Sequence, residues 1–470
     1  MFRIVTRASK DASAVKAALE RFYPGWGIEV KTLKGVRKVD DMLANIYSIL
    51  EEDGSKPTII LLGREDEAKI PVIEEKLPPG VVAHVVPRRS VRNARLELIA
   101  AEIARARAKF RLLAAWDDKR NIYVFGARGK RLEKLGFEPS FELFIGLGSF
   151  SRLVSVLAGG KIGDNPLVLR THGNLHLVYN GPLVRAELEI PDYGVAPRAR
   201  IVGSKPVSVS LDSLVDANRE TIDLLASYSK EFLLGLGEFD TVIVPWSGGK
   251  DSTAALLLAI EAFGADKVTA LYVDTGTEFP SSKSYVYEVA EKLGVKLVEA
   301  YAGIDKELLS GSMPMPSHDN RWCTGLKIEA IEKKVRELAR GRTLLVIGDR
   351  DAESPRRSQR PPVRPGPASN VIAAAPLKMW SGAHIQLYIL SRGLRLNPMY
   401  YAGFYRIGCY MCPALRSWEL LAISEYRKEY LRLLRSPIFR RFISMRLRRR
   451  YKHGFDSEGC DADSVAICSQ

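Results

Sequence analysis

Residues 241–263 read TVIVPWSGGKDSTAALLLAIEAF, and this stretch decides the fold class. It starts with an apolar, β-branched run of strand length and continues, from Asp251 to Phe263, with an apolar pattern of helical period. The two glycines between them let the backbone turn sharply and bring its N–H groups against an oxyanion, while the helix start directs its positive end to the same point. The stretch therefore predicts an anion-binding turn between a strand and a helix.

The side chains of this turn also suit a phosphate chain. Lys250 adds a full positive charge, Ser247 and Ser252 add hydroxyl donors, and Asp251 or Ser252 can cap the helix. The predicted phosphate contacts are Ser247, Gly248, Gly249, Lys250, Asp251 and Ser252. The spacing is not that of the G-x-x-x-x-G-K-[ST] loop, which disfavours a γ-phosphate-cleaving motor or GTPase. A tight turn without a ligand is the simpler alternative.

The same strand, turn and helix order repeats along the following residues. Further strands are predicted at Lys267–Val273, Lys296–Tyr301 and Thr343–Ile347, with helices at Ser282–Leu293 and Gly325–Ala339 between them. Strands that alternate with crossover helices form a parallel sheet covered on both faces, and its ligands lie at the carboxyl ends of the strands. Functional residues are therefore expected directly after the strands.

Charged residues follow two of these strands. Asp274 can orient a ribose hydroxyl or hold Mg²⁺, although an Asp-Thr-Gly turn without a ligand looks similar. After the fourth strand, Arg350 and Arg357 are candidate clamps for the anionic end of a nucleotide, because arginine forks bind phosphate or sulfate in paired contacts. The alternative is a solvated basic loop, to which Arg360 and Arg364 belong.

Three of the five cysteines have metal-ligand spacing. Cys409 and Cys412 form a C-x-x-C pair, and Cys323 lies more than eighty residues before them. These three thiolates can fill three corners of an iron-sulfur cluster or of a zinc site. Nearby cations are expected to favour thiolates, namely Arg321, Lys327 and Arg406. Buried, inert thiols are the alternative.

In order and residue type, these motifs resemble the phosphoadenylyl sulfate (PAPS) reductase family, a branch of the ATP pyrophosphatase superfamily, from about Asp240 to Leu415. The matching elements are Ser247 to Thr253, Asp274 to Pro280, the G-x-R-x-x-E-S-x-x-R order of Gly348, Arg350, Glu353 and Arg357, and the cysteine segments. The resemblance implies an α/β, parallel-sheet, adenine nucleotide alpha hydrolase-like (Rossmann-like) domain. It also implies an ATP or adenylyl sulfate ligand with Mg²⁺, Glu353 in the nucleotide site, and a [4Fe-4S] cluster, with Zn²⁺ as the alternative.

The sequence departs from this family at three points. Trp322 takes the first position of a Cys-Cys pair, so Cys460 or His318 is a candidate fourth ligand. Reductases of the family usually have a degraded glycine loop, whereas the loop here is intact and suited to ATP. Their catalytic cysteine lies in a Glu-Cys-Gly-Leu-His tail, where this chain has Glu458-Gly459-Cys460-Asp461.

The length of 470 residues exceeds what one hydrophobic core usually organises, so several units are expected. They are a small α/β domain of unknown role (1–130), a β-rich module that could bind RNA (136–210), the nucleotide-binding domain (223–420) and a basic helical tail (421–470). In the tail, arginines alternate with Phe439, Phe442 and Tyr451, a pattern typical of RNA contact. An arginine-rich helix that pairs with acidic surface is the alternative.

The composition limits location and partners. A formal charge of +15 attracts polyanions such as nucleotides or RNA. No apolar run is long enough to cross a membrane, and the first residues lack the order of a secretory signal, so a cytoplasmic protein is expected. Glutamine occurs only three times, at Gln359, Gln386 and Gln470, which favours a thermophilic source.

The leading hypothesis is an enzyme that performs sulfur-linked chemistry on an adenine nucleotide beside a cysteine-bound metal centre. ATP-dependent adenylation followed by sulfur transfer, as in tRNA thiolation, would need tRNA or another RNA and a thiol or sulfide donor. Sulfate-assimilating reduction of adenylyl or phosphoadenylyl sulfate would need Cys460 as nucleophile. A non-catalytic, zinc-stabilised RNA-binding protein is the opposing hypothesis. The candidate catalytic residues are Lys250, Asp274, Arg350 and Cys460. The sequence leaves the oligomeric state open.

Overall fold

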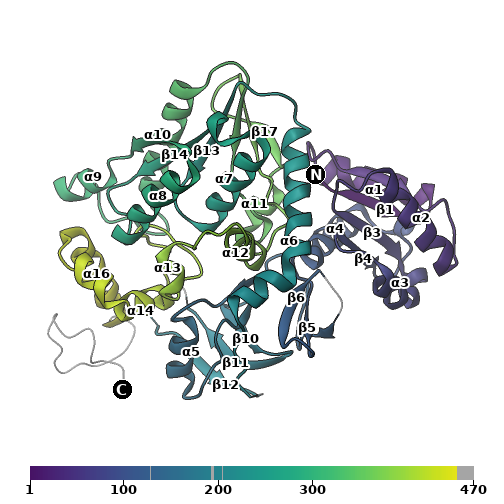
Figure 1. The fold of residues 1–470 in the computed structure, drawn as a ribbon, viewed down its shortest axis with the longest axis horizontal. Coiled ribbons are helices and arrows are strands. Elements are labelled where there is room, and N and C mark those ends of the chain that lie inside the picture. The colour runs from purple at the N-terminus through teal and green to yellow at the C-terminus, as the bar shows by residue number, and fades with distance from the viewer. Residues whose placement is uncertain (127–128, 192–194, 204, 452–470) are drawn as a thin grey trace.

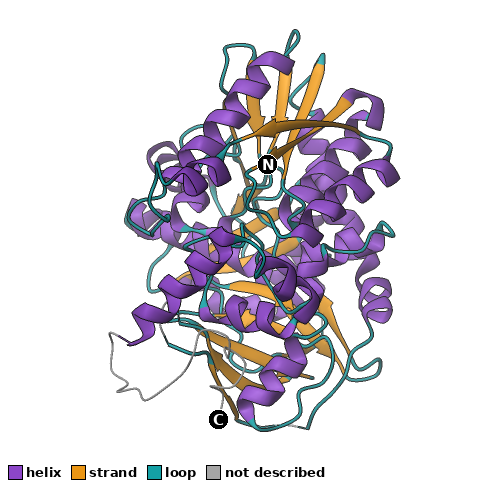
Figure 2. Ribbon diagram, turned by 90° about the vertical axis from the view of Figure 1, so that its left-hand side faces the viewer, coloured by secondary structure: helices purple, strands orange, loops and turns teal. Residues whose placement is uncertain are grey.

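The computed structural model describes residues 1–451 except 127–128, 192–194 and 204. Its strands form four separate sheets with helices packed around them (Figures 1 and 2). In the described part of the chain, no helix has the length and apolar character needed to span a membrane.

The first unit is a four-stranded parallel sheet in the order β2-β1-β3-β4, with helices on both faces. Its strands are β1 (Arg3–Thr6), β2 (Glu29–Thr32), β3 (Thr58–Gly63) and β4 (Val81–Val86). Its helices are α1 (Ser9–Phe22), α2 (Val39–Glu52), α3 (Ile70–Lys76) and α4 (Leu96–Leu112). The apolar runs at Phe2–Val5, Thr58–Leu62 and Val81–Val86 thus lie in or overlap these strands. Both faces of β3 are buried, as expected for a parallel strand between helices.

Residues 114–131 do not continue this parallel sheet. They form a small antiparallel sheet of β5 (Ala114–Asp117), β6 (Ile122–Phe125) and β7 (Lys130–Arg131), in the order β6-β5-β7. The apolar run Ile122–Phe125 therefore forms a strand, but it pairs locally with β5. The reason is the short Asp117–Ile122 connection, which allows only an antiparallel hairpin and not a crossover.

The β-rich module is an antiparallel sheet in the open order β12-β11-β10-β9-β8, not a closed barrel, with helix α5 (Phe150–Ala158) packed on it. Its strands are β8 (Glu142–Ile145), β9 (Leu167–Arg170), β10 (Leu175–Asn180), β11 (Leu183–Glu189) and β12 (Arg198–Ile201). The dipeptide Asn180-Gly181 joins β10 to β11, and Gly181 has the positive φ of 68° that such turns require.

The central unit is a six-stranded sheet in the order β15-β14-β13-β16-β18-β17. Its strands are β13 (Thr241–Trp246), β14 (Val268–Asp274), β15 (Lys296–Tyr301), β16 (Thr343–Val346), β17 (Val363–Pro365) and β18 (Val371–Ala374). All pairs are parallel except β17 with β18. The predicted parallel-sheet α/β fold class is confirmed, and the sheet gains two strands that the sequence analysis did not identify.

Helices cover both faces of the central sheet. The first face carries α7 (Lys250–Phe263), α8 (Pro280–Leu293) and α12 (Gly382–Ser391), and α10 (Trp322–Leu338) contributes to the core of the opposite face. The long helix α6 (Leu211–Leu234) packs against α7 and α12 and also against β6, so it joins the central unit to the earlier ones (Figure 1). One apolar core runs through all three units.

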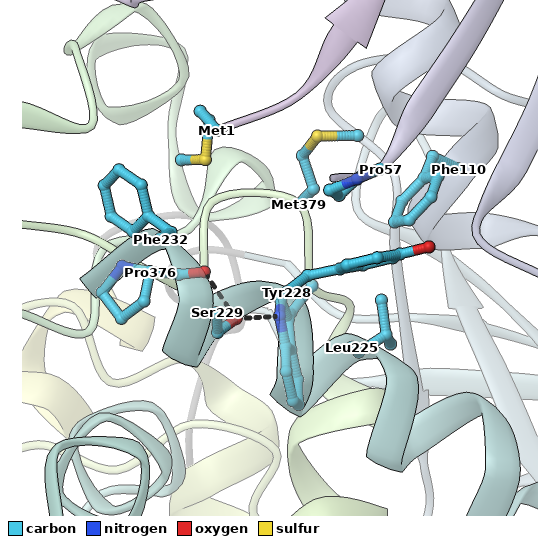
Figure 3. A pocket seen from close by; sticks show the side chains of 10 residues that line it. Met1, Pro57, Phe110, Leu225, Tyr228, Ser229, Phe232, Pro376 and Met379 are labelled. Atoms are coloured by element: carbon cyan, nitrogen blue, oxygen red, sulfur yellow. Dashed lines mark hydrogen bonds between the residues drawn. The ribbon is translucent and has the colours of Figure 1, made fainter. Parts of the chain in front are cut away.

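The junction between the first unit and α6 is closely packed. Figure 3 shows Met1, Pro57 and Phe110 facing Tyr228 and Phe232 of α6 across a small cavity. The cavity has about 20 Å³ of space, which is room for about one water molecule. This junction therefore holds the units together and offers no room for a ligand.

The C-terminal helices fold back onto the central unit. They are α14 (Ser417–Glu425), α15 (Arg427–Leu433) and α16 (Pro437–Tyr451). Phe439 and Phe442 are 1% and 4% exposed and pack in a core with Tyr410. The prediction that these two rings present stacking surfaces to RNA is therefore wrong, because they lie on the apolar side of α16. Residues 452–470 lie outside the described residues, as does the candidate nucleophile Cys460.

Candidate functional site

The glycine loop lies at the carboxyl end of β13, where the chain reverses its direction across the sheet. From β13 the chain continues to β14 and β15 on one side, and then returns to β16 on the other side of β13. Ligands of open parallel sheets bind in the crevice formed at such a switch point. The residues after β13 and β16 therefore face one another across the predicted site.

The backbone of the loop is fixed from several directions. Gly248 has a φ of 69°, and a Cβ there would lie 2.9 Å from the Cγ2 atom of Val286, so only glycine fits. The Gly248 carbonyl accepts a hydrogen bond from Asn397 Nδ2 at 3.2 Å, and the Lys250 N–H donates to the Tyr400 hydroxyl at 2.9 Å. Neither Asn397 nor Tyr400 was identified from the sequence, because both come from a segment about 150 residues away.

Several donors of the loop remain available. Within the described part of the chain, the N–H groups of Gly248, Gly249 and Asp251 donate to no protein acceptor. Ser247 and Ser252 face each other with their hydroxyl oxygens 3.2 Å apart. Since α7 begins at Lys250, the positive end of its dipole points at the same place. The loop thus has the free donors that an anion needs.

The charged residues of the loop are engaged with one another. Lys250 is 7% exposed, its Nζ atom lies 2.9 Å from Asp251 Oδ2, and it lies 5.8 Å from the centre of the Tyr400 ring. Burial alone would raise the pKa of Asp251, but the adjacent Arg350 and Lys250 cations lower it to about 2. Asp251 is therefore ionised and holds both cations at the start of α7.

Arg350 lies at the centre of a buried network. It is 2% exposed, and its guanidinium donates to Asp251 Oδ1 at 2.5 Å and to Glu142 Oε2 at 2.6 Å. Burial alone would lower the pKa of Arg350, but Asp251 and Glu142 raise it. Glu142 belongs to β8 of the β-rich module and was not predicted as a site residue. No local sequence signal marks it, since it lies 208 positions before Arg350.

The rest of the loop after β16 has a second charged group. Glu353 accepts a hydrogen bond from the Arg350 N–H at 3.0 Å and forms an ion pair with Arg357. Asp349 lies within 3.6 Å of Arg357, 3.5 Å of Arg360 and 3.0 Å of Arg364. The basic loop is therefore ordered around a carboxylate, and Arg357, 40% exposed, is the predicted clamp with the greater access to solvent.

Gly348 brings the two loops into contact. A Cβ at this position would lie 2.8 Å from the backbone C and O atoms of Asp251 and 3.0 Å from the Ser252 N atom. The end of β16 therefore lies directly against the first turn of α7. The structure thus brings together the predicted residues Ser247 to Ser252, Gly348, Arg350, Glu353 and Arg357.

Asp274 ends the neighbouring strand β14 and is held by local contacts. It accepts hydrogen bonds from the Gly276 N–H at 2.8 Å and from Lys283 Nζ at 2.5 Å. Burial alone would raise the pKa of Asp274, but Lys283 lowers it. Glu278, which is close to Asp274, has a raised pKa because it is buried. Two carboxyl groups whose pKa values shift in opposite directions thus lie at the end of β14.

The cysteine segments meet the sheet at this same strand end. Cys409 Sγ lies 3.5 Å from Thr275 Oγ1, and the Tyr410 N–H donates to the Thr277 carbonyl at 2.9 Å. Cys412 lies in the same turn as Cys409, with a hydrogen bond of 3.0 Å from its N–H to the Cys409 carbonyl. His318 Nε2 lies 2.7 Å from the Pro413 carbonyl oxygen. Trp322, in the position where a cysteine was expected, binds the Pro314 carbonyl instead.

The thiols do not have the environment predicted for them. Burial raises the pKa of Cys409, and the Glu278 carboxylate adds to this effect. Burial also raises the pKa of Cys323, together with the nearby Cys412. The expected stabilisation of thiolates by Arg321, Lys327 and Arg406 is therefore outweighed by burial at Cys323 and Cys409. Cys323 and Cys412 are close enough to interact electrostatically.

A single metal ion has no ready site here. Across residues 1–451, apart from the undescribed gaps, no three His, Cys, Asp or Glu side chains are grouped as ligands of one ion. The three predicted ligands nevertheless lie in one region, Cys409 beside Thr275 and Cys323 near Cys412.

Comparisons with known proteins match the part of the chain that contains this site. Residues 241–415 match the phosphoadenosine phosphosulfate reductase domain model. An uncharacterised protein of Methanocaldococcus jannaschii is 31% identical, over 48% of this chain and 46% of that protein. An adenosine 5'-phosphosulfate reductase of Rhodococcus erythropolis is 26% identical, over 31% of this chain and 58% of the reductase. The chain thus spans about half the length of these curated relatives.

A solved structure of a phosphoadenylyl-sulfate reductase from Candida auris is 20% identical, covers 45% of this chain and 99% of that one, and has a TM-score of 0.33. The similarity to the PAPS reductase family thus lies in residues 241–415, which contain the parallel sheet and the glycine loop.

Proposed function

We propose that this protein is an enzyme that binds ATP at the glycine loop and uses it for sulfur-linked chemistry beside Cys323, Cys409 and Cys412. The observation that carries the proposal is the position of Cys409, whose Sγ lies 3.5 Å from Thr275 at the end of β14, the strand next to the glycine loop. A nucleotide phosphate chain and a sulfur group would then share one edge of the sheet.

The loop residues have separate roles in the proposed adenylation. The free N–H groups and Lys250 bind the phosphates, and Arg357 clamps the anionic end. Attack of an acceptor oxygen on the α-phosphorus breaks the bond to the bridging oxygen, and pyrophosphate leaves with its charge stabilised by the loop, with Mg²⁺ as the usual counter-ion. A thiol or sulfide donor then attacks the activated carbon, and AMP leaves with the acceptor oxygen.

Asp274 and Arg350 are proposed to act in different ways. Asp274, ionised at the end of β14, is suited to a ribose hydroxyl or to Mg²⁺. Arg350 is buried between Asp251 and Glu142 and so positions the start of α7 instead of contacting phosphate directly. This assignment revises the clamp role predicted for Arg350 to a positioning role. Cys460 remains a candidate nucleophile that is predicted from the sequence alone.

The first test is nucleotide binding by a Lys250→Met variant. We expect ATP to bind about tenfold to a hundredfold more weakly, because charge-assisted hydrogen bonds to phosphate are worth about 1.5–3 kcal/mol. Isothermal titration with ATP and with adenylyl sulfate measures the change. Lys267→Met, an exposed lysine before the opposite end of β14, is the matched control and should bind as the wild type does.

The same titrations separate the reactions. Tight ATP binding with release of pyrophosphate supports the proposal. A preference for adenylyl sulfate, with turnover lost in Cys460→Ser, would instead identify a sulfate-assimilating reductase. If neither nucleotide binds, the protein is not a nucleotide-dependent enzyme, and a non-catalytic RNA-binding role replaces the proposal.

The metal content gives a second, independent prediction. The thiols of Cys323, Cys409 and Cys412 would hold a [4Fe-4S] cluster, which supplies an iron site able to bind sulfur. We expect protein purified without oxygen to contain iron and acid-labile sulfide, and the Cys409→Ala variant to lose most of both. Colourless protein with about one zinc per chain and no iron would contradict the cluster. Serine variants at the undescribed Cys460 test whether it is the fourth ligand.

A further inference from the structure

The first unit has an open cleft of its own, separate from the nucleotide site. The cleft has a volume of about 590 Å³ and lies at the carboxyl edge of the parallel sheet β2-β1-β3-β4. All four strands contribute, because Arg7 follows β1, Arg37 follows β2, Arg64 follows β3 and Arg88 follows β4. The carboxyl edge is where parallel sheets place their ligands.

The inner part of this cleft is charge-balanced. Arg7 is 8% exposed and its guanidinium contacts Glu65 at 2.7 Å and the buried Asp66 at 2.9 Å. Lys69 also pairs with Asp66, at 2.6 Å. Two cations and two carboxylates therefore form a neutral base to the cleft.

The rim of the cleft is not balanced. It has five exposed arginines, and none of them forms an ion pair in the described part of the chain: Arg37, Arg64, Arg88, Arg89 and Arg92. Five like charges around one cleft repel one another, and an anion bound between them would relieve this repulsion. An arginine that only stabilises a surface would be expected beside a carboxylate.

The loops that present these arginines are held in place. The Arg64 N–H donates to the Arg89 carbonyl at 3.0 Å, and the Arg92 N–H donates to Asp11 Oδ1 at 3.1 Å. A Cβ on Gly63 would lie 2.8 Å from the Ser90 Cα atom, so the loops after β3 and β4 touch. Arg88 adopts a φ of 68°, which is rare for a residue with a side chain. The cleft is therefore formed before a ligand arrives.

The lining indicates which anion fits. Apart from the seven cations, it consists of Glu65 and Ser90, with no aromatic or aliphatic side chain. Pockets for small organic ligands are mostly apolar, and a base needs a stacking surface. The sugar-phosphate backbone of a base-paired RNA, by contrast, presents a series of phosphates and sugars to the protein, and several side chains can contact it at once. A series of phosphates along such a backbone can contact five arginines that are spread over three loops, which one small anion cannot do.

We propose that this cleft binds the phosphate backbone of a base-paired segment of RNA and so positions the RNA without reading its sequence. The net charge of +15 favours the approach of such a polyanion. The proposal does not depend on the reaction at the glycine loop. It also differs from RNA contact through the tail rings, since Phe439 and Phe442 are buried.

The test compares two charge-reversal variants of the full chain. Arg88→Glu/Arg89→Glu changes the rim of the cleft, while Lys16→Glu/Arg21→Glu makes the same charge change on the exposed side of α1. The probe is a fluorescent RNA hairpin with a stem of about 16 base pairs, titrated at several salt concentrations. The first variant should bind at least tenfold more weakly, with the slope of log K against log salt reduced by about 2.

Three outcomes would overturn the proposal. Both variants could bind the hairpin equally well, which would place the RNA elsewhere or reflect net charge alone. Inorganic phosphate or AMP could displace the hairpin at micromolar concentration from the wild type, which would identify a small-anion site. A single-stranded RNA of the same length could bind more tightly than the hairpin. Unchanged ATP binding by Arg88→Glu/Arg89→Glu keeps this result separate from any failure at the glycine loop.

Discussion

Replacement of Arg350 with methionine is expected to lower the free energy of unfolding by about 3–5 kcal/mol, because it leaves buried carboxylates without their partner. Arg350 binds Asp251 at 2.5 Å and Glu142 at 2.6 Å, and it also donates to the Trp380 carbonyl at 3.3 Å. Lys250 still neutralises part of the charge on Asp251, but within the described residues Glu142 has no other ion-pair partner. Denaturant titration followed by circular dichroism measures the loss.

A nearby arginine provides the control for this result. Arg364, on β17, forms an ion pair with Asp349 of the same loop, but Asp349 is shared with Arg357 and Arg360. Arg364→Met should therefore cost about 1 kcal/mol or less. Arg350→Lys should lie between the two, since lysine keeps the charge but cannot reach both carboxylates with one planar fork. Equal losses of unfolding free energy in Arg350→Met and Arg364→Met would mean that the Arg350 network stabilises the fold no more than the shared ion pair of Arg364 does.

A methyl group on Gly348 is expected to damage both folding and function. The new Cβ would lie 2.8 Å from backbone atoms of Asp251, which no side-chain rotation can relieve. The end of β16 and the start of α7 must then separate. Overpacking of this kind costs about 1–3 kcal/mol, and displacement of the loop donors should weaken ATP binding. Thermal unfolding and ATP titration of Gly348→Ala measure the two effects.

Gly325 is the matched control. Like Gly348, it does not have a left-handed φ, so alanine can adopt its backbone conformation. It lies inside α10, and an added Cβ there meets no atom within 4 Å. Gly325→Ala should leave stability unchanged or raise it by up to about 1 kcal/mol, since alanine favours a helix over glycine. A Gly348→Ala protein as stable as Gly325→Ala, with wild-type ATP affinity, would contradict the close contact between β16 and α7.

The central sheet could be predicted because its signals are local. Each of β13, β14, β15 and β16 is a β-branched or apolar run, and each is followed by a turn and a helical pattern. By contrast, β17 and β18 were not predicted, because both strands are short. Val363–Pro365 lies among prolines and arginines, and Val371–Ala374 contains only small and β-branched residues in a run of four. β18 pairs with β16 and β17 pairs with β18, and the local sequence encodes neither pairing.

The site was predicted only as far as its own loops extend. The glycine loop, Asp274 and the cysteines follow strands or lie in short motifs, so their types and spacing identified them. Glu142, Asn397 and Tyr400 complete the site from segments more than 100 residues away, and only tertiary packing brings them there. The rings of α16 were misinterpreted for a similar reason, since charge in a helix gives no direct sign of which side faces the core.

The carboxylate of Glu142 also limits how this chain can be recombined. It belongs to β8, yet it balances a cation that stands beside the nucleotide loop. Exchange of the β-rich module for an unrelated one would leave that cation without its counter-ion, unless the new module supplied an acidic group at the same place. Any chimaera of this protein must therefore replace Glu142 and Arg350 together. The β-rich module cannot be exchanged without regard to this ion pair.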